Sequence, residues 1–169
     1  MIIDTEEFSK FANCLADHAS KTSMHYFRNK IKIEIKDDES PVTLADKETE
    51  QIIRDEIRKK FPNHGILGEE YEDENLDSEF IWVIDPIDGT RSYIAGHKDF
   101  GNLIALLHNK KPVLGIINCP AHGERWMGIK NQKTKCNGKM FKLVQLIKLK
   151  MPIFLHLDYI LMNLKSEKD

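Results

Sequence analysis

An apolar run at residues 80–84 leads directly into a segment that carries two aspartates, Asp85 and Asp88. A near-continuous apolar run of this length is typical of a strand that is buried on both faces. Such a strand delivers Asp85 at its carboxyl end, where open sheets place their ligands. The chain is therefore expected to form a sheet that is packed on both faces, with this strand inside it and a charged side chain at the strand's carboxyl end.

Two helices are predicted before this strand, because apolar side chains recur there at helical spacing. The first is expected to begin at a capping pair, Asp4 with Glu7, and to run to about Phe27. The second is expected to begin after Thr43, a favourable N-cap, and to stop at the Pro-Asn-His-Gly segment of residues 62–65.

The other strands are predicted from short alternating or apolar runs at residues 31–35, 66–67, 103–107, 113–118 and 125–129. Hairpin turns are expected at residues 109–112 and 121–124, and Asn137-Gly138 marks a further turn. A polar run at residues 36–41 is expected to be a loop. These elements predict an α/β chain of the α+β type, with an N-terminal helix pair packed on a largely antiparallel sheet.

The composition is that of a globular protein, with 41% hydrophobic and 31% charged residues among 169. A net charge of −2 offers no electrostatic case for nucleic acid or an anionic membrane as a partner. Residues 143–164 are apolar, but they include Lys148, Lys150, Pro152 and Asp158. A spanning helix needs about 20 residues with few or no charges, so we do not expect a membrane span.

The three cysteines, Cys14, Cys119 and Cys136, show no Cys-x-x-Cys spacing. This pattern argues against a disulfide framework and against a structural zinc site. We expect three reduced thiols in a cytoplasmic protein, mostly buried as small hydrophobic side chains.

The segment from Asp85 to Thr90 is the strongest candidate for chemistry. The carboxylates of Asp85 and Asp88, with the backbone carbonyl of Ile87 between them, can converge on one or two metal ions. Gly89 lets the backbone approach a ligand closely, and Gly89-Thr90 can open a helix whose N–H groups hold a phosphate. An ordinary Asp-Gly turn is the alternative, but it leaves the first aspartate unexplained.

Two further acidic segments can complete this site. Glu69 and Glu70 follow a short strand and can offer oxygen ligands to a hard cation, although a solvated acidic turn is the alternative. Asp46 fits the first turn of a helix by its interaction with the helix dipole alone. It gains a catalytic role only if Thr90 is its partner, because a threonine hydroxyl bonded to a carboxylate can relay a proton from water.

In this order, the pieces resemble the inositol monophosphatase family of Mg2+-dependent, lithium-sensitive phosphatases. The resemblance covers roughly residues 8–139 and rests on four motifs: residues 40–46, 68–70, 82–90 and 136–138. Within the family, residues 91–96, 100–106, 112–117 and 124–126 look most like the bacterial histidinol-phosphatase branch. The chain is then expected to form the first half of the layered αβαβα fold of that family, as a metal- and phosphate-binding domain at residues 1–139.

The resemblance implies a role for each candidate residue. The metal ligands would be Glu69, Asp85, Asp88 and the Ile87 carbonyl, with Glu70 bound nearby or through water; Gly89 and Thr90 would bind the phosphate; Asp46 and Thr90 would orient and deprotonate the attacking water. Lys36 and Arg91 are weaker candidates for substrate contact, with a solvated loop charge and a salt bridge as their alternatives. The implied cofactor is Mg2+, as two or three ions, with Mn2+ as a substitute and Li+ as an inhibitor. The implied reaction is in-line attack of metal-activated water on a small phosphorylated alcohol.

The second half of the family fold has no counterpart here, including a Trp-Asp-x-Ala-Ala-Gly-like segment whose aspartate completes the metal site. Residues 140–169 form an apolar tail without clear periodicity, which stays unassigned. Three functional hypotheses therefore remain. They are histidinol phosphate hydrolysis, hydrolysis of inositol 1-phosphate or another sugar phosphate, and a truncated chain that binds metal and phosphate with weak or no turnover. A homodimer is one of the assemblies left open.

Overall fold

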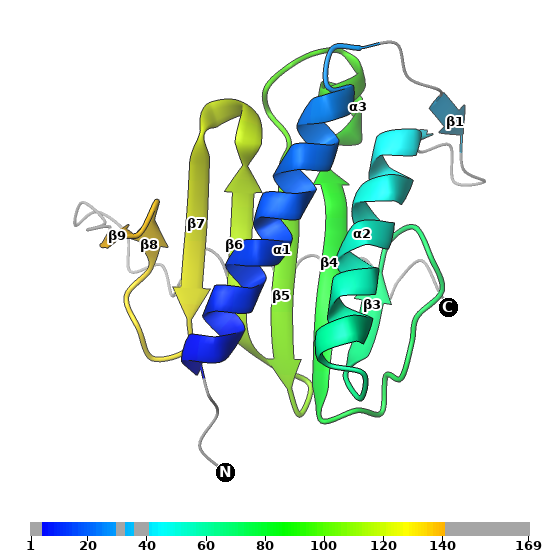
Figure 1. Cartoon of the computed structure of the whole chain (residues 1–169). Helices are drawn as coiled ribbons and strands as arrows, with labels where there is room; N and C mark the ends of the chain where they lie inside the picture. The colour runs from blue at the N-terminus through cyan, green and yellow to red at the C-terminus, as the bar shows by residue number, and fades with distance from the viewer. Residues whose placement is uncertain (1–4, 30–32, 36–40, 141–169) are drawn as a thin grey trace.

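Two long helices lie side by side on one face of a seven-stranded sheet (Figure 1). The computed structural model describes residues 5–29, 33–35 and 41–140. Helix α1 spans Thr5–Tyr26 and helix α2 spans Leu44–Lys60, close to the predicted bounds. Thr43 caps α2 as predicted: its hydroxyl accepts the amide of Ala45, and its own amide donates to Asp46.

The sheet has the order β3-β4-β5-β6-β7-β8-β9, and only β3 and β4 pair in parallel. Its strands are β3 (Gly65–Gly68), β4 (Phe80–Asp88), β5 (Gly101–His108), β6 (Lys111–Cys119), β7 (Glu124–Ile129), β8 (Lys135–Cys136) and β9 (Lys139–Met140). A separate antiparallel pair is formed by β1 (Ile33–Ile35) and β2 (Pro41–Thr43), while α3 (Thr90–Ile94) and a 3-10 turn (Pro120–His122) join strands. The predicted helix pair on a largely antiparallel sheet is confirmed.

Strand β4 is buried on both faces, as its apolar run predicts. Trp82 and Ile84 point toward the helices and join the main core. Ile81 and Val83 alternate with them and pack into a second apolar cluster on the opposite face. Burial of each such side chain stabilises the fold by about 1.5–3 kcal/mol relative to exposure. The strand is therefore a rigid support for the aspartates at its carboxyl end.

The carboxyl end of β4 differs from the prediction, because the strand continues past Ile84 to Asp88. The pairing with β5 jumps from Asp85–Leu103 to Asp88–Gly101, so the aspartate segment is a bulge within the sheet. Pro86 lies in the bulge and has no N–H to give to the ladder, which explains the irregular pairing. Both aspartates therefore stand on strand backbone and not in a free loop.

The predicted burial of the cysteines is wrong. All three thiols are free, but Cys14 is exposed and the other two are half-buried. Cys14 precedes Leu15 on α1, and the buried stripe of that helix passes through Leu15 instead. Within the described ranges, no helix is long and apolar enough to cross a bilayer. Asp4, Lys36 and the tail at residues 141–169 lie outside the described residues, so the predictions made for them stay untested.

Candidate active site

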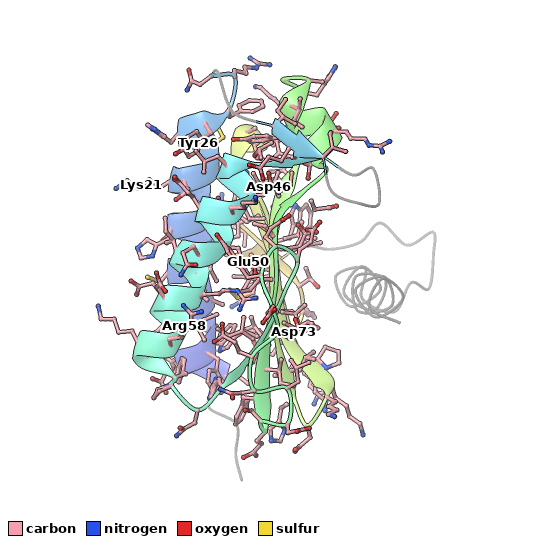
Figure 2. The ribbon with its side chains drawn as sticks, turned by 90° about the vertical axis from the view of Figure 1, so that its right-hand side faces the viewer. Lys21, Tyr26, Asp46, Glu50, Arg58 and Asp73 are labelled. Atoms are coloured by element: carbon pink, nitrogen blue, oxygen red, sulfur yellow. The ribbon has the colours of Figure 1, made fainter. Side chains whose placement is uncertain are left out.

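Three acidic segments meet at one end of the sheet: the first turn of α2, the segment after β3, and the bulge of β4. Seen along the edge of the sheet, Asp46 lies between α2 and the strands (Figure 2). The charges of Glu69, Asp88 and Asp46 all act on the carboxyl of Asp85. The predicted site residues from three distant parts of the sequence are thus brought together.

Asp46 contacts both the N-terminal cap of α2 and Thr90. One oxygen, Oδ2, accepts the amide of Thr43 at 2.8 Å and so completes the N-terminal cap of α2. The other, Oδ1, accepts the hydroxyl of Thr90 at 3.4 Å. Asp46 is 1% exposed, and this burial raises its pKa while the hydrogen bonds from Thr43 act in the opposite direction. The cap fixes the carboxylate, which can then face Thr90 without losing its own support.

Asp85 has an environment that is unfavourable for an isolated carboxylate. Its oxygen Oδ1 is buried and has no hydrogen-bond partner among the described residues. Burial raises the pKa of Asp85 well above its ordinary value, and the neighbouring charges of Glu69 and Asp88 raise it further. The side chain of Glu69 also contacts the carboxyl of Asp85, and this contact raises the pKa of Asp85 in the same direction. A bound cation would offset the repulsion between these carboxylates and would give the buried oxygen of Asp85 a partner.

The hydroxyl of Thr90 links the bulge to Asp46. Thr90 Oγ1 lies 2.9 Å from the carbonyl oxygen of Ile87 and 3.4 Å from Asp46 Oδ1. A hydroxyl has one proton to donate, so it holds one of these acceptors at a time. When the proton is donated to Asp46, a lone pair of Thr90 is free to accept from a third group. Asp46 and Thr90 are therefore neighbours, as the expected relay requires, and the relay itself stays a prediction.

Gly89 joins the bulge to α3 in a conformation that favours glycine. It is the N-cap of α3, with φ of 86° and ψ of 36°. A Cβ atom there would also lie 2.9 Å from the carbonyl oxygen of Asp99. The predicted turn of β4 into a helix at Gly89-Thr90 is therefore confirmed, and α3 is five residues long.

A buried ion pair on α2 holds the acidic segment after β3, and the sequence reasoning missed it. Glu50 Oε2 accepts the backbone amides of Glu69 and Glu70 at 3.0 and 2.8 Å. Glu50 Oε1 accepts Arg54 Nε at 2.7 Å, and Arg54 also binds the backbone carbonyl of Tyr71. The spacing of four residues between Glu50 and Arg54 was a visible signal, but it is equally common on exposed helix faces.

The donor set fits a hard divalent cation. The side chains whose charges act on Asp85 are the carboxylates of Glu69, Asp88 and Asp46. The carbonyl of Ile87 lies next to Thr90, and the buried oxygen of Asp85 lacks a partner among the described residues. No group of three or more His, Cys, Asp or Glu side chains in the described part of the chain is already spaced to hold a metal ion. Arg91 is exposed on α3, outside this group of carboxylates.

Comparison with known proteins identifies the family. The sequence model of the inositol monophosphatase family matches residues 4–157. The chain belongs to the inositol monophosphatase family. This family match reaches beyond residue 139, into the tail that the sequence analysis left unassigned.

Individual relatives within the inositol monophosphatase family agree with this assignment. The chain is 44% identical to the bifunctional phosphatase IMPL2 of Arabidopsis thaliana, over 80% of this chain and 40% of the relative. It is 41% identical to a histidinol-phosphatase of Chlorobaculum parvum, over 73% of this chain and 48% of the relative. The chain thus spans about half or less of the length of these relatives.

The fold is also that of the inositol monophosphatase family. An inositol monophosphatase structure from Zymomonas mobilis superposes with a TM-score of 0.72 at 41% identity, covering 86% of this chain and 56% of that one. The layered αβαβα expectation is thus supported for the part of the fold that this chain contains. The family and its relatives are phosphatases, which fits the acidic, oxygen-rich site described above.

Proposed function

We propose that this chain carries the metal- and phosphate-binding half of a Mg2+-dependent phosphomonoesterase that acts on histidinol phosphate. The observation that carries the proposal is the state of the Asp85 carboxylate. Its oxygen Oδ1 is buried and has no protein partner among the described residues, and the charges of Asp88 and Glu69 act on the same carboxylate. Mg2+ prefers oxygen ligands and is commonly held by one or two carboxylates together with substrate phosphate.

The roles of the side chains follow from their positions. Glu69, Asp85, Asp88 and the Ile87 carbonyl would hold the cation, with Glu70 beside it. When bound, Mg2+ would activate a water molecule and stabilise negative charge on the phosphoryl oxygens. Thr90 would take a proton from that water while its own proton passes to Asp46, and Asp46 keeps its orientation through the Thr43 cap.

Support for the cation and for the substrate comes from relatives. A solved IMPase/NADP phosphatase of the same fold was determined with Mg2+ and phosphate. The substrate follows the Chlorobaculum parvum relative, which is a histidinol-phosphatase. Inositol 1-phosphate or another sugar phosphate is the alternative substrate within the same chemistry. Because the chain spans about half of its relatives, binding of metal and phosphate with little turnover is the second candidate function.

The proposal is tested by phosphate release from histidinol phosphate and from inositol 1-phosphate, with Mg2+ or with EDTA. Asp88→Asn is expected to abolish Mg2+-dependent release. Asp55→Asn is the matched control, because Asp55 is an exposed aspartate on α2 that binds only Gln51 and Arg58 among the described residues. Equal, measurable Mg2+-dependent rates for the unaltered chain and Asp88→Asn would remove the proposed site.

Calorimetric titration with Mg2+ and Mn2+ separates the two candidate functions. Binding with turnover supports the phosphatase. A preference of at least tenfold in kcat/KM for one of the two substrates identifies the substrate, and such a ratio corresponds to about 1.4 kcal/mol of transition-state stabilisation. Binding without turnover supports the metal- and phosphate-binding chain. Absence of metal binding would contradict both.

A further inference from the structure

A line of three polar side chains crosses the sheet from β7 to the bulge of β4. Arg125 Nε donates to Asn118 Oδ1 at 2.9 Å. Asn118 Nδ2 donates to Asn102 Oδ1 at 2.8 Å, and Asn102 Nδ2 donates to the carbonyl oxygen of Pro86 at 2.7 Å. Pro86 lies between Asp85 and Ile87, so the line ends on the backbone of the candidate metal-binding segment.

The direction of this line is fixed by its outer end. A guanidinium group can only donate, so Arg125 requires the amide oxygen of Asn118 to face it. The amide nitrogen of Asn118 is then turned toward the oxygen of Asn102, and the amide nitrogen of Asn102 toward Pro86. The carbonyl of Pro86 can only accept, so the two ends agree and both amides have one orientation.

The two amide side chains of the line are buried, and their hydrogen bonds are complete. Asn102 is 0% exposed and Asn118 is 3% exposed. The second N–H of Asn102 faces Ser23 Oγ, and that of Asn118 faces Ser20 Oγ at 2.8 Å, both on α1. Buried amides with all partners in place hold one geometry, because any rotation leaves a donor or acceptor without a partner.

The line ends at the point where the hydrogen-bond ladder between β4 and β5 is interrupted. The pairing of β4 with β5 is irregular between Asp85 and Asp88. Asn102, on β5, therefore supplies with its side chain the donor that a regular ladder would have supplied with its backbone. With the Pro86 carbonyl held toward β5, the next carbonyl, that of Ile87, is left to face Thr90.

We propose that Asn102 is a positioning residue, and that the line Arg125–Asn118–Asn102 holds the shape of the bulge from Asp85 to Asp88. Its effect on cation affinity rests on the proposed function, whereas its effect on the shape of the bulge does not. Outer groups that orient metal ligands typically change metal affinity by about 10–100-fold when they are removed.

Two substitutions disturb the line, at its middle or at its outer end, without touching the bulge. Asn118→Asp at pH 8 keeps a partner for Arg125 but places a carboxylate oxygen against Asn102 Oδ1, which forces Asn102 to turn its own oxygen toward Pro86. Arg125→Met keeps an unbranched apolar stem and removes the donor, whereas Arg125→Lys retains a group that only donates. Asp17→Asn is the control for Arg125, because Asp17 binds the outer face of the guanidinium at 2.7 Å and does not contact Asn118.

The first measurement is hydrogen–deuterium exchange of the metal-free chain over residues 85–90. Asn118→Asp and Arg125→Met are expected to speed exchange of the backbone amides there by about tenfold, the effect of losing one hydrogen bond. Arg125→Lys and Asp17→Asn are expected to exchange like the unaltered chain. Unchanged exchange in both Asn118→Asp and Arg125→Met would overturn the inference, whatever the metal measurements show.

The second measurement is Mn2+ affinity, by calorimetry or by the EPR signal of free Mn2+. Asn118→Asp and Arg125→Met are expected to weaken binding by about tenfold, with recovery in Arg125→Lys. Both substitutions make the chain more negative, and charge alone would strengthen cation binding, so the sign separates positioning from simple electrostatics. Equal or tighter binding would refute the effect on the cation. Faster exchange with no Mn2+ binding by the unaltered chain would refute the proposed function but uphold the role of the line in shaping the bulge.

Discussion

Glu50 and Arg54, one turn apart on α2, form a 2.7 Å ion pair in which the side chains are 0% and 1% exposed. Glu50 lies on the side of α2 that faces the strands (Figure 2). Because Glu50 also binds the amides of Glu69 and Glu70, a structural pair in the core is coupled to the candidate metal ligands.

We expect Glu50→Gln to lower the free energy of unfolding by about 3 kcal/mol, because it removes the fully buried carboxylate that pairs with Arg54 and leaves only the more exposed Glu74 as its partner. Urea denaturation of the metal-free chain measures this loss. Asp55→Asn, at the exposed pair with Arg58, is expected to cost less than about 1 kcal/mol. Similar losses in the two variants would show that burial of the Glu50–Arg54 pair does not increase its contribution to the free energy of unfolding.

Gly68 is expected to tolerate no side chain, because a Cβ atom there would clash with the carboxylate of Glu50 and lie 2.5 Å from Arg54 Nη2. Gly68→Ala should cost about 1–3 kcal/mol of stability as the ion pair is displaced. Gly101→Ala is the comparison, since its nearest contact would be 3.4 Å, to the carbonyl of Asn118. Thermal unfolding of both variants distinguishes them, and equal melting temperatures would contradict this reading of Gly68.

Asp85→Asn is expected to stabilise the metal-free chain at pH 8 and to have a smaller effect at pH 5. The folded state raises the pKa of Asp85 above its ordinary value of 3.8, so the associated stability is present at low pH and is lost as pH rises through the raised pKa. Asparagine removes this loss. Urea denaturation with EDTA at the two pH values measures the change in stability. A less stable Asp85→Asn chain at pH 8 would contradict the repulsion between Asp85 and its neighbouring carboxylates. The same variant should lose Mg2+-induced stabilisation, which is about 2.7 kcal/mol at 100 times the Kd.

His64 is expected to contribute a pH dependence of the opposite sign. Trp82 Nε1 donates to His64 Nδ1 at 3.1 Å, which needs a ring nitrogen without a proton. Burial lowers the pKa of His64 below 6.5, so its contribution is present above pH 6.5 and is lost as pH falls through the lowered pKa. His64→Gln should therefore lose less stability than the unaltered chain between pH 7.5 and pH 5.5. His97→Gln, at an exposed position, is the control, and equal pH dependence in all three chains would exclude this role of His64.

Local patterns in the sequence predicted much of the fold. The apolar run before Asp85 predicted a strand buried on both faces, and Thr43 predicted the start of α2, because both signals are contained in a few adjacent residues. The grouping of Asp46, Glu69 and the β4 aspartates came from the family resemblance, and the structure brings them together.

The supports of the site could not be predicted in this way. In the sequence, Glu50 and Arg54 look like an exposed helix pair, and Asn102 is a single polar residue in an apolar strand. Their roles depend on partners that are 16 or more positions away, such as the Pro86 carbonyl for Asn102 and the Glu69 amide for Glu50. The bulge was missed for the same reason, because it is defined by register against β5 and not by its own residues.

The position of Asn118 and Arg125 in the chain has a consequence for synthesis. Every carboxylate of the candidate site leaves the ribosome before β6 and β7, which carry these two residues. A nascent chain thus contains all of these acidic segments before it contains Asn118 and Arg125, the two outer members of the line that ends at Pro86. The order of translation makes completion of the bulge a late event, which coincides with the docking of β6 and β7 onto the strands already made.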